Sequence, residues 1–439
     1  MMDKIIEMLK ASGADAWEII DTKTKGWEFY FIRHRLDQNR AKDVEHILVK
    51  VYKLHGGDPA EGAEAAAAQY MGVASTEFSP TDSPEEMKKA IDSLVYKASL
   101  VNNPPYRLNT PKTAVPLENP LRLLSEEAAD FIGTMNRIAE TDTEDLNSYE
   151  IFTSAVERRL VNSEGIDITE RYPSSMVEVV INARKDGHEI ELYRLYDQGS
   201  CDSDGLKRDV DELLQFGKDR LRTKPTPALG EAPVVFSTDA AVQIYAYFLD
   251  NLNTAYQVRH LSPFVIGSPI AEEIRGDRIT LESVRVLPGS PENFAYDGEG
   301  APIRDAVLIE DSVPKEFVGG RMFSQYMGLE DAFSVSNWRV RGGAKSAAEL
   351  RTGRFLEIVE FSDFQVDSMT GDIFGEIRLG YFHDGEGNVT PVSGGSVSGN
   401  MADNVPGMYL SRETRRYSCA EIPSVTRLEK ISIAGAAKD

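Results

Sequence analysis

Residues whose side chains can bind a metal ion lie close together in a glycine-rich stretch that runs from Thr370 to Asn400. It contains His383, Asp384 and Glu386, and imidazole and carboxylate groups are ligands for zinc and iron. The same residues belong to the segment His383-Asp384-Gly385-Glu386-Gly387-Asn388, whose composition is typical of a turn. We favour the turn over the metal site, because Asp, Gly and Asn form such turns for backbone reasons alone.

Three other segments match known binding or catalytic motifs only in part. The run from Gly394 to Gly399 lacks the lysine of a phosphate-binding loop. The run Asp202-Ser203-Asp204-Gly205 begins like a calcium loop but continues with Leu206, so the start of a helix explains it better. His188-Glu189 is not followed by a second histidine at a zinc-binding spacing.

The cysteines and the remaining histidines add no clear catalytic set. Cys201 and Cys419 are the two cysteines of the chain, which excludes a disulfide framework and a four-cysteine zinc site. Cys419 has no histidine near it in sequence, so we interpret it as a small buried residue. The scattered histidines are interpreted as satisfied surface or core residues; they are His34, His46, His55 and His260.

The elements that must position these residues begin with an N-terminal α+β region, residues 1–228. In residues 1–101 we expect a helix near the N-terminus, strands from Trp17 onward, and a second helix that begins with the capping box Ser83-Pro84-Glu85-Glu86. Residues 102–120 hold five prolines, a density typical of an extended connector.

Residues 121–222 give the same series again. A helical stripe follows Ser125, and a further helix carries Leu206 to Leu221. Between them, short alternating runs extend from Tyr149 to Leu195 and are split by the hairpin-type turns Ser163-Glu164-Gly165 and Lys185-Asp186-Gly187. Helix, strands and helix therefore occur twice, and a structural duplication is one interpretation of this order.

The C-terminal region, residues 229–439, is expected to be rich in strands. Val234-Val235-Phe236 predicts a short buried strand, and a helix with an apolar face from Ala241 to Leu252 follows. Beyond residue 264 short strands alternate with Gly, Pro and Asp-Gly turns, as in an antiparallel sheet that curls into a barrel. The sequence predicts an α+β fold with a C-terminal, mainly antiparallel, β-barrel-like domain.

Composition excludes several classes of protein. The chain has 439 residues, long enough for two or more structural units, and a formal net charge of -23. Such a charge argues against direct nucleic-acid binding, which depends on Lys and Arg contacts to phosphates. The first residues lack the pattern of a signal peptide, and no run of eighteen apolar residues predicts a membrane helix. We expect a cytoplasmic protein.

Several segments, read together, resemble the TldD/PmbA family, also called modulator of DNA gyrase. They share order and spacing with that family over nearly the full chain, although no single one is specific; they are Arg159–Gly165, Tyr296–Pro302, Val307–Glu310, Thr370–Asp372 and Ser398–Asn400. The resemblance implies metal-dependent hydrolysis of extended peptides. It also implies that the stretch from Thr370 to Asn400 is C-terminal scaffold.

In catalytic members of that family a HExxxH motif follows the Val-Val strand, and a C-terminal cysteine completes a zinc site. Here the two histidine positions and the glutamate position fall on Ala246, Asn251 and Tyr247, and Cys419 is the one remnant. Alanine and tyrosine cannot replace an imidazole and a general base. The resemblance therefore implies a non-catalytic PmbA/TldE-like chain that carries no cofactor and pairs with a zinc-containing, TldD-type HExxxH subunit.

Two alternatives remain at this stage. The chain could be a peptidase by itself, with a non-standard metal site that includes His260 and Cys419. It could also be a regulatory protein that binds other proteins and is linked to control of DNA gyrase. Expected partners are the TldD-type subunit and unfolded or extended peptides, with a homodimer as another assembly.

Overall fold

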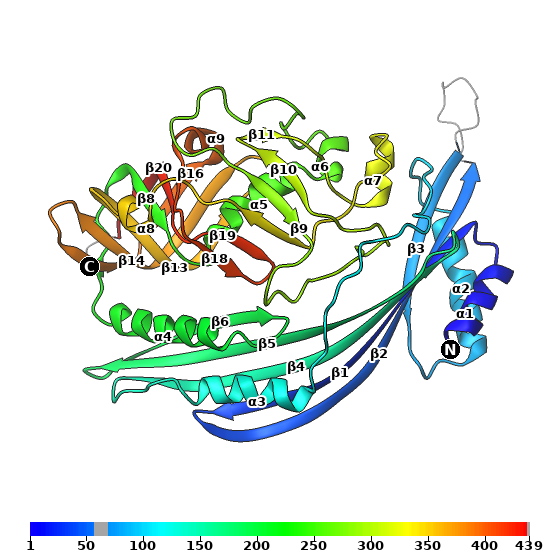
Figure 1. Ribbon diagram of the computed structural model, residues 1–439, viewed down its shortest axis with the longest axis horizontal. Helices are drawn as coiled ribbons and strands as arrows, with labels where there is room; N and C mark the ends of the chain where they lie inside the picture. Colours follow the sequence, from blue (N-terminus) through cyan, green and yellow to red (C-terminus); the bar gives the residue numbers. More distant parts are fainter. Residues whose placement is uncertain (57–68, 437–439) are drawn as a thin grey trace.

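A computed structural model describes residues 1–56 and 69–436 (Figure 1). It contains a long, curved antiparallel sheet in the N-terminal region and, in the C-terminal region, a closed five-stranded barrel with a second sheet beside it. The predicted α+β class with a C-terminal barrel is confirmed. The domain boundaries remain a prediction.

The N-terminal sheet has the strand order β3-β2-β1-β4-β5-β6. Its strands are β1 (Ala16–Ile32), β2 (Arg35–Gly56), β3 (Gln69–Phe78), β4 (Glu144–Asn162), β5 (Asp167–Lys185) and β6 (His188–Gln198). Its helices are α1 (Met2–Ala11), α2 (Pro84–Ala98), α3 (Leu124–Met135) and α4 (Ser203–Arg220). One helix, three strands and one helix thus precede the proline-rich connector, and the same series follows it.

Local sequence signals explain where these helices begin. Ser83 and Glu86 form the predicted capping box of α2, in which each side chain accepts from the main chain of the other residue. Asp202 caps α4 by accepting from the N–H of Gly205 at 3.0 Å, so the calcium-like run is a helix start, as expected.

The strands between Tyr149 and Leu195 are separated at the two predicted turns, but they are longer than the short runs expected. β4 and β5 each continue for 19 residues, and the turns lie where Gly165 and Gly187 adopt positive φ angles. β4 has partner strands on both sides, β1 and β5, over most of its length. Neighbouring strands supply hydrogen bonds along the whole length of β4, so the strand does not end where the apolar alternation breaks. Such breaks mark places where a different part of the protein covers the face of the sheet.

The barrel closes because β14 pairs with both β13 and β16. Around it the order is β13-β8-β20-β16-β14. The strands are β8 (Gly230–Phe236), β13 (Arg354–Val366), β14 (Asp372–Asp384), β16 (Ser396–Asn400) and β20 (Thr426–Ala434), with β7 (Lys224–Pro225), β15 (Val389–Ser393) and β17 (Tyr409–Leu410) attached. The stretch from Thr370 to Asn400 supplies three of these strands.

The second C-terminal sheet and several short helices complete the fold. The sheet has the order β11-β10-β9-β12-β19-β18. Its strands are β9 (Leu281–Val284), β10 (Ala306–Glu310), β11 (Val313–Pro314), β12 (Asn337–Val340), β18 (Thr414–Tyr417) and β19 (Ala420–Pro423). The helices are α5 (Ala241–Asn251), α6 (Thr254–Val258), α7 (Arg321–Tyr326), α8 (Ala347–Leu350) and α9 (Met401–Asn404), with a 3-10 turn at Val405–Gly407.

Helix α5 packs into the main C-terminal core. Ile244 and Phe248 are fully buried there, and the hydroxyl of Tyr245 lies 2.7 Å from that of Thr426 in β20. Within residues 1–56 and 69–436, none of the helices combines the length and the hydropathy that a membrane crossing needs.

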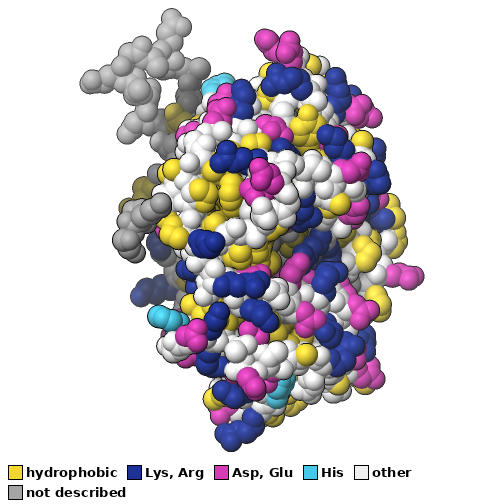
Figure 2. All heavy atoms as spheres, turned by 90° about the vertical axis from the view of Figure 1, so that its left-hand side faces the viewer, with side chains coloured by type: hydrophobic (Ala, Val, Ile, Leu, Met, Phe, Trp, Pro, Cys, Tyr) yellow, Lys and Arg dark blue, Asp and Glu magenta, His cyan; other side chains and the backbone are white. Residues whose placement is uncertain are grey.

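The N-terminal sheet contacts the C-terminal region along one side of the molecule. In Figure 1 the sheet curves below the barrel, with α4 between them at the left and α1 and α2 at the far right. On the face shown in Figure 2, acidic and basic side chains are interspersed among apolar ones, although the chain carries a net charge of -23. Tyr381 of β14 donates to Asp219 of α4 at 2.7 Å across this contact.

Candidate functional site

Helix α5 places the three positions predicted for a HExxxH motif in or beside the barrel core. Tyr247 is buried, and its ring meets those of Phe248 and Phe264 edge to face, at 5.4 and 6.0 Å. Asn251 is fully buried, and its amide nitrogen donates to the carbonyl oxygens of Tyr247 and Ser368, each at 2.9 Å. Ala246 directly precedes Tyr247 in the helix and has no polar side-chain atom. All three side chains serve packing.

Cys419 lies in the turn between β18 and β19. Its carbonyl accepts from the N–H of Trp338 at 3.1 Å, and Ser418 before it has a φ of 50°. Burial, together with the negative charges of Glu292 and Asp197, raises the pKa of the Cys419 thiol to about 11. A thiol with this pKa is protonated at neutral pH, whereas metal binding requires the thiolate.

The other predicted ligands lie apart from α5. His260 follows α6 in an exposed position with a φ of 56°, and no hydrogen bond or ion pair between described residues joins it to Cys419. His383 stacks on Phe355 with ring centroids 4.1 Å apart, and burial lowers its pKa. In the described part of the chain, no group of three His, Cys, Asp or Glu side chains is arranged to hold a metal ion.

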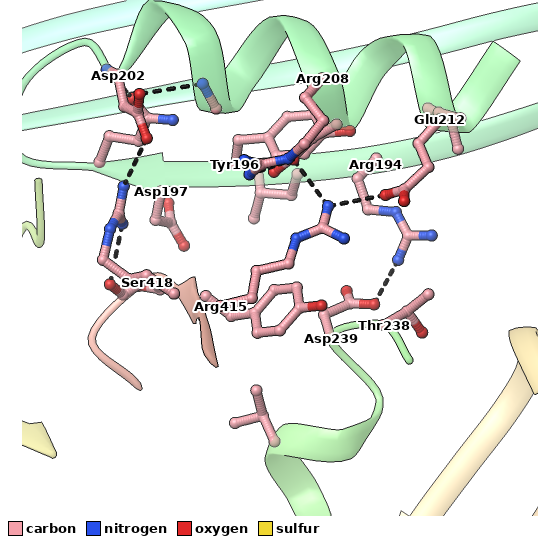
Figure 3. Close-up of a pocket in the computed structure, with 18 of the residues that line it drawn as sticks. Arg194, Tyr196, Asp197, Asp202, Arg208, Glu212, Thr238, Asp239, Arg415 and Ser418 are labelled. Carbon is pink, nitrogen blue, oxygen red and sulfur yellow. Dashed lines mark hydrogen bonds and ion pairs between the residues drawn. The ribbon is translucent and has the colours of Figure 1, made fainter. Parts of the chain in front are cut away.

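A cavity beside α5 lies where the N-terminal sheet meets the C-terminal region. This junction cavity has a volume of about 540 Å³. It is bounded by residues 194–198 of β6, the outer face of α4, the start of α5 and residues 414–418 at β18 (Figure 3). The sequence analysis did not predict it, because its walls come from four segments far apart in the chain.

Ion pairs cross the junction cavity and fix its walls. Arg194 of β6 contacts Asp239 at 2.6 Å and also pairs with Glu360 of β13. On the other side, Arg415 of β18 reaches Asp209 and Glu212 of α4 at 2.7 and 2.8 Å (Figure 3). Since each arginine joins the two regions, the cavity is held between charged cross-links and not between loose loops.

One donor in these cross-links has no acceptor. The Nε of Arg415 is buried and makes no hydrogen bond to a described residue, although one terminal nitrogen of the same guanidinium, Nη2, donates to both Asp209 and Glu212. A buried N–H without a partner costs free energy. Because Arg415 lines the cavity, this group is suited to a carbonyl oxygen of a bound molecule.

The edge of β6 along this cavity is open. The carbonyl of Glu191 accepts from Arg378 at 3.1 Å, and the N–H of Gly199 donates to Gly289 at 3.0 Å, so odd-numbered residues direct their main-chain groups away from β5. Between them, the outward groups of Tyr193, Leu195 and Asp197 have no partner among the described residues.

β18 presents a second open edge to the same cavity. Tyr417 pairs with Ala420 across a two-residue turn, and Arg415 pairs with Ile422. In this hairpin register the main-chain groups of Thr414 and Arg416 point away from β19. They too have no main-chain partner among the described residues. The cavity therefore lies beside two strand edges that can each bind an extended chain.

A comparison with known protein families identifies the C-terminal region. Residues 229–435 match the family model described as the PmbA/TldA metallopeptidase C-terminal domain. This match assigns the C-terminal region, residues 229–435, to the TldD/PmbA family. The resemblance inferred from the sequence is confirmed at the level of the family.

Solved structures share the TldD/PmbA fold over the whole length. TldE from Thermococcus kodakarensis has a TM-score of 0.75 and 17% identity, with 99% of this chain and 100% of that chain covered. A candidate modulator of a DNA gyrase from Thermotoga maritima gives 0.76 and 15%, with 99% of each chain covered. A similar protein from Bacteroides thetaiotaomicron gives 0.75 and 14%, covering 99% and 98%. No curated protein matches the sequence of this chain.

The zinc site of the family's catalytic members does not fit the residues present. Ala246 offers no donor, Tyr247 is enclosed by aromatic rings, and the amide nitrogen of Asn251 is engaged with two carbonyl oxygens. Cys419 alone keeps the ligand type of the family, and one thiolate does not make a zinc site.

The residues around the junction cavity had weak signals in the sequence. Arg415, Arg416 and Tyr417 directly precede the family-like cysteine, and Tyr193 and Leu195 are apolar at positions that prove 54% and 39% exposed. Exposed apolar residues on a strand indicate an interaction edge, but exposure cannot be read from the sequence. The cavity is the candidate functional site.

Proposed function

We propose that this chain is the non-catalytic, PmbA/TldE-type subunit of a heteromeric zinc metallopeptidase in the cytoplasm. A TldD-type partner with an HExxxH helix supplies the zinc, and this chain binds extended peptide in the junction cavity. The observation that carries the proposal is helix α5, which has the packing residues Ala246, Tyr247 and Asn251 where a catalytic member has its ligands and borders the cavity.

The two open strand edges support the peptide-binding part. An extended segment can add to β6 through the outward groups of Tyr193, Leu195 and Asp197 and, on its other side, to β18 through Arg416. The free Nε–H of Arg415 adds a donor for one peptide carbonyl. Main-chain hydrogen bonds of this kind tolerate many side chains, which suits a subunit that receives unfolded segments.

The non-catalytic part is tested by the zinc content of the purified chain, measured by elemental analysis after dialysis against zinc and then against buffer. We expect far less than one zinc per chain and no hydrolysis of an unfolded protein by this chain alone. Stoichiometric zinc that disappears in a Cys419→Ser variant would instead establish a self-sufficient peptidase with a non-standard site. Glu386→Gln, an exposed change in the β14–β15 turn, is the control variant.

The peptide-binding part is tested with a short fluorescein-labelled peptide of alternating threonine and valine, followed by fluorescence anisotropy. Methylation of the peptide nitrogens at alternate positions removes the donors on one edge only. If the peptide bridges β6 and β18, both complementary methylated peptides bind weakly. If only one edge is used, one of the two keeps its affinity, and equal affinity of all three peptides would refute binding by strand addition.

The partner is tested by mixing this chain with a TldD-type subunit from the same organism and measuring the mass of the complex by light scattering. A heteromer that hydrolyses the unfolded protein supports the proposal. A stable homodimer that does not bind the TldD-type subunit contradicts the proposal and favours a protein-binding, regulatory role.

A further inference from the structure

A second cavity adjoins the junction cavity on the face of the N-terminal sheet. This aromatic cavity has a volume of about 420 Å³. Its walls are residues of β1, β2, β4 and β5 on one side and the loop Pro291–Phe294 on the other. Asp197 and Ser418 line both cavities, so a chain bound beside β6 can direct a side chain from the first cavity into the second.

Two carboxylates of the aromatic cavity have no cationic partner. Asp197, at the end of β6, and Glu292, in the facing loop, make no side-chain hydrogen bond or ion pair with a described residue, whereas most acidic side chains near them are paired. In Figure 3 the Asp197 side chain points from β6 toward the turn at Ser418. Each carboxylate is therefore free to accept from a bound donor.

A buried hydroxyl in the same wall is also without a partner. Ser175 of β5 is only 4% exposed, lines the aromatic cavity, and has an Oγ with no hydrogen-bond partner among the described residues. It lies opposite Gln198 in the β5–β6 register, next to Asp197. A buried polar atom without a partner indicates a site that a ligand or a water molecule completes.

The remaining charges around the cavity do not neutralise the two carboxylates. Its lining holds three acidic side chains, those of Glu28, Asp197 and Glu292, against one ammonium, that of Lys42. Glu28 is already paired with Arg40. Arg416, which lines the junction cavity, forms an ion pair with Asp202 at 3.9 Å and with neither Asp197 nor Glu292.

The other walls are suited to an aliphatic stem. Phe152 and Met176 are half-buried in the cavity lining, and the rings of Tyr172 and Phe294 meet edge to face at 4.7 Å. Lysine and arginine bury their methylene stems against apolar surface and keep the charged end with polar partners. The combination of an apolar wall with two free carboxylates and a free hydroxyl matches such a side chain.

We infer that the aromatic cavity binds the cationic side chain, lysine or arginine, of a peptide held in the junction cavity. The inference rests on the proposed peptide binding and gives the subunit a preference for basic segments. Asp197 and Glu292 are the specificity-determining residues, and Ser175 is an additional acceptor.

The experiment uses the labelled threonine and valine peptide with one central residue changed to lysine, arginine or norleucine, with both ends blocked. We expect the lysine and arginine peptides to bind about five- to tenfold more tightly than the norleucine peptide at about 0.15 M ionic strength. A norleucine peptide with a free N-terminal amine separates recognition of a side chain from recognition of a chain terminus. If that peptide binds as tightly as the lysine peptide, the cavity recognises an ammonium at the terminus and the inference is wrong.

A double variant tests which residues carry the preference. Asp197→Asn with Glu292→Gln should abolish the difference in affinity between the lysine and norleucine peptides. The control variant is Glu272→Gln with Glu273→Gln, two exposed residues outside both cavities, which alters the net charge equally. A preference that falls equally in both variants would show a nonspecific effect of the net charge.

The pH dependence adds a second readout. Burial raises the pKa of Asp197, and burial together with the negative charge of Asp197 raises the pKa of Glu292. Protonation removes the negative charge, so the preference for lysine should decline as the pH falls. The neighbouring charged groups are Glu28 and Lys42 in the aromatic cavity and Asp202, Arg208 and Arg416 in the junction cavity, with the thiol of Cys419 nearby.

The outcomes separate this inference from the proposed function. If no peptide of the series binds, the proposed peptide binding fails and the inference fails with it. If lysine, arginine and norleucine peptides bind equally tightly, peptide binding stands and the inference alone is overturned.

Discussion

The two outer strands of the N-terminal sheet, β3 and β6, have opposite surroundings. At β3, the N–H of Met71 donates to Asn103 of the connector at 2.9 Å, and Gly72 approaches the end of α2 so closely that a Cβ would lie 1.7 Å from the carbonyl oxygen of Ala98. At β6, the outward main-chain groups of Leu195 and Asp197 have no partner among the described residues, and both residues line a cavity. The same sheet thus has one covered edge and one available edge.

The difference shows how the fold reserves an edge for binding. An uncovered edge strand risks aggregation, and proteins usually cover it with a helix or loop. At β3 the connector and α2 do so. At β6 the side chains of Arg194 and Arg415 hold the C-terminal region at a distance, which leaves the main chain open but confines it within a cavity.

The largest expected effect is the loss of stability when the covered edge at β3 is disrupted. Gly72→Ala places a Cβ against the backbone oxygens of Ala98 and Val101, so the end of α2 must move away from β3. We expect the free energy of unfolding to fall by about 3 kcal/mol or more, measured by urea denaturation. Gly133→Ala in α3 is the control, since its Cβ meets nothing within 4 Å, and it should stabilise slightly. Equal stability of Gly72→Ala and wild type would contradict close packing at β3.

The next largest effect is the loss of stability when the Arg194 cross-link beside the available edge is removed. Arg194→Met leaves Asp239 and Glu360 without their cation, and we expect a loss of about 3 kcal/mol. Arg171→Met removes an arginine that is 66% exposed and paired with Glu157, so its loss should be below about 1 kcal/mol. The two variants are compared by the same denaturation. Similar losses would mean that Arg194 adds no more than a surface ion pair.

The dependence of stability on pH tests the Glu360 side of the same cross-link. Burial raises the pKa of Glu360 from its ordinary 4.5 to about 7, although Arg194 opposes the shift. The folded state therefore binds this proton more tightly than the unfolded state, so the added stability is present below about pH 4.5 and is lost as the pH rises through about 7. Relative to Glu360→Gln, wild type should lose about 3 kcal/mol across that interval. Parallel stability curves would exclude this assignment.

The smallest effect on stability should accompany a large effect on binding. Leu195→Pro removes an N–H that has no partner, and edge strands tolerate such a proline, so the free energy of unfolding should change by less than about 1 kcal/mol. Affinity for the threonine and valine peptide should fall more than about tenfold. Ile190→Pro, where the N–H faces β5, should instead cost about 2 kcal/mol. Undiminished peptide affinity in Leu195→Pro would mean that the β6 edge is not used.

Local features of the fold were predictable because their causes lie within a few residues. The capping box at Ser83, the helix start at Asp202 and the turn after Asp384 depend on side chains that reach their own backbone. The lengths of β4 and β5 were not predictable in this way. They depend on partner strands that pair along both sides, and no local residue pattern records those partners.

The sequence by itself determined the identities at the zinc positions: Ala246 and Tyr247 lack the required donor groups in any fold. It also determined the series of helices, strands and turns, through periodicity and capping. Only the tertiary structure decided that β6, α4, α5 and β18 enclose a cavity and that two strand edges in it stay open. The reason is physical, because burial and charge compensation depend on which distant segments meet, whereas donor chemistry belongs to each side chain alone.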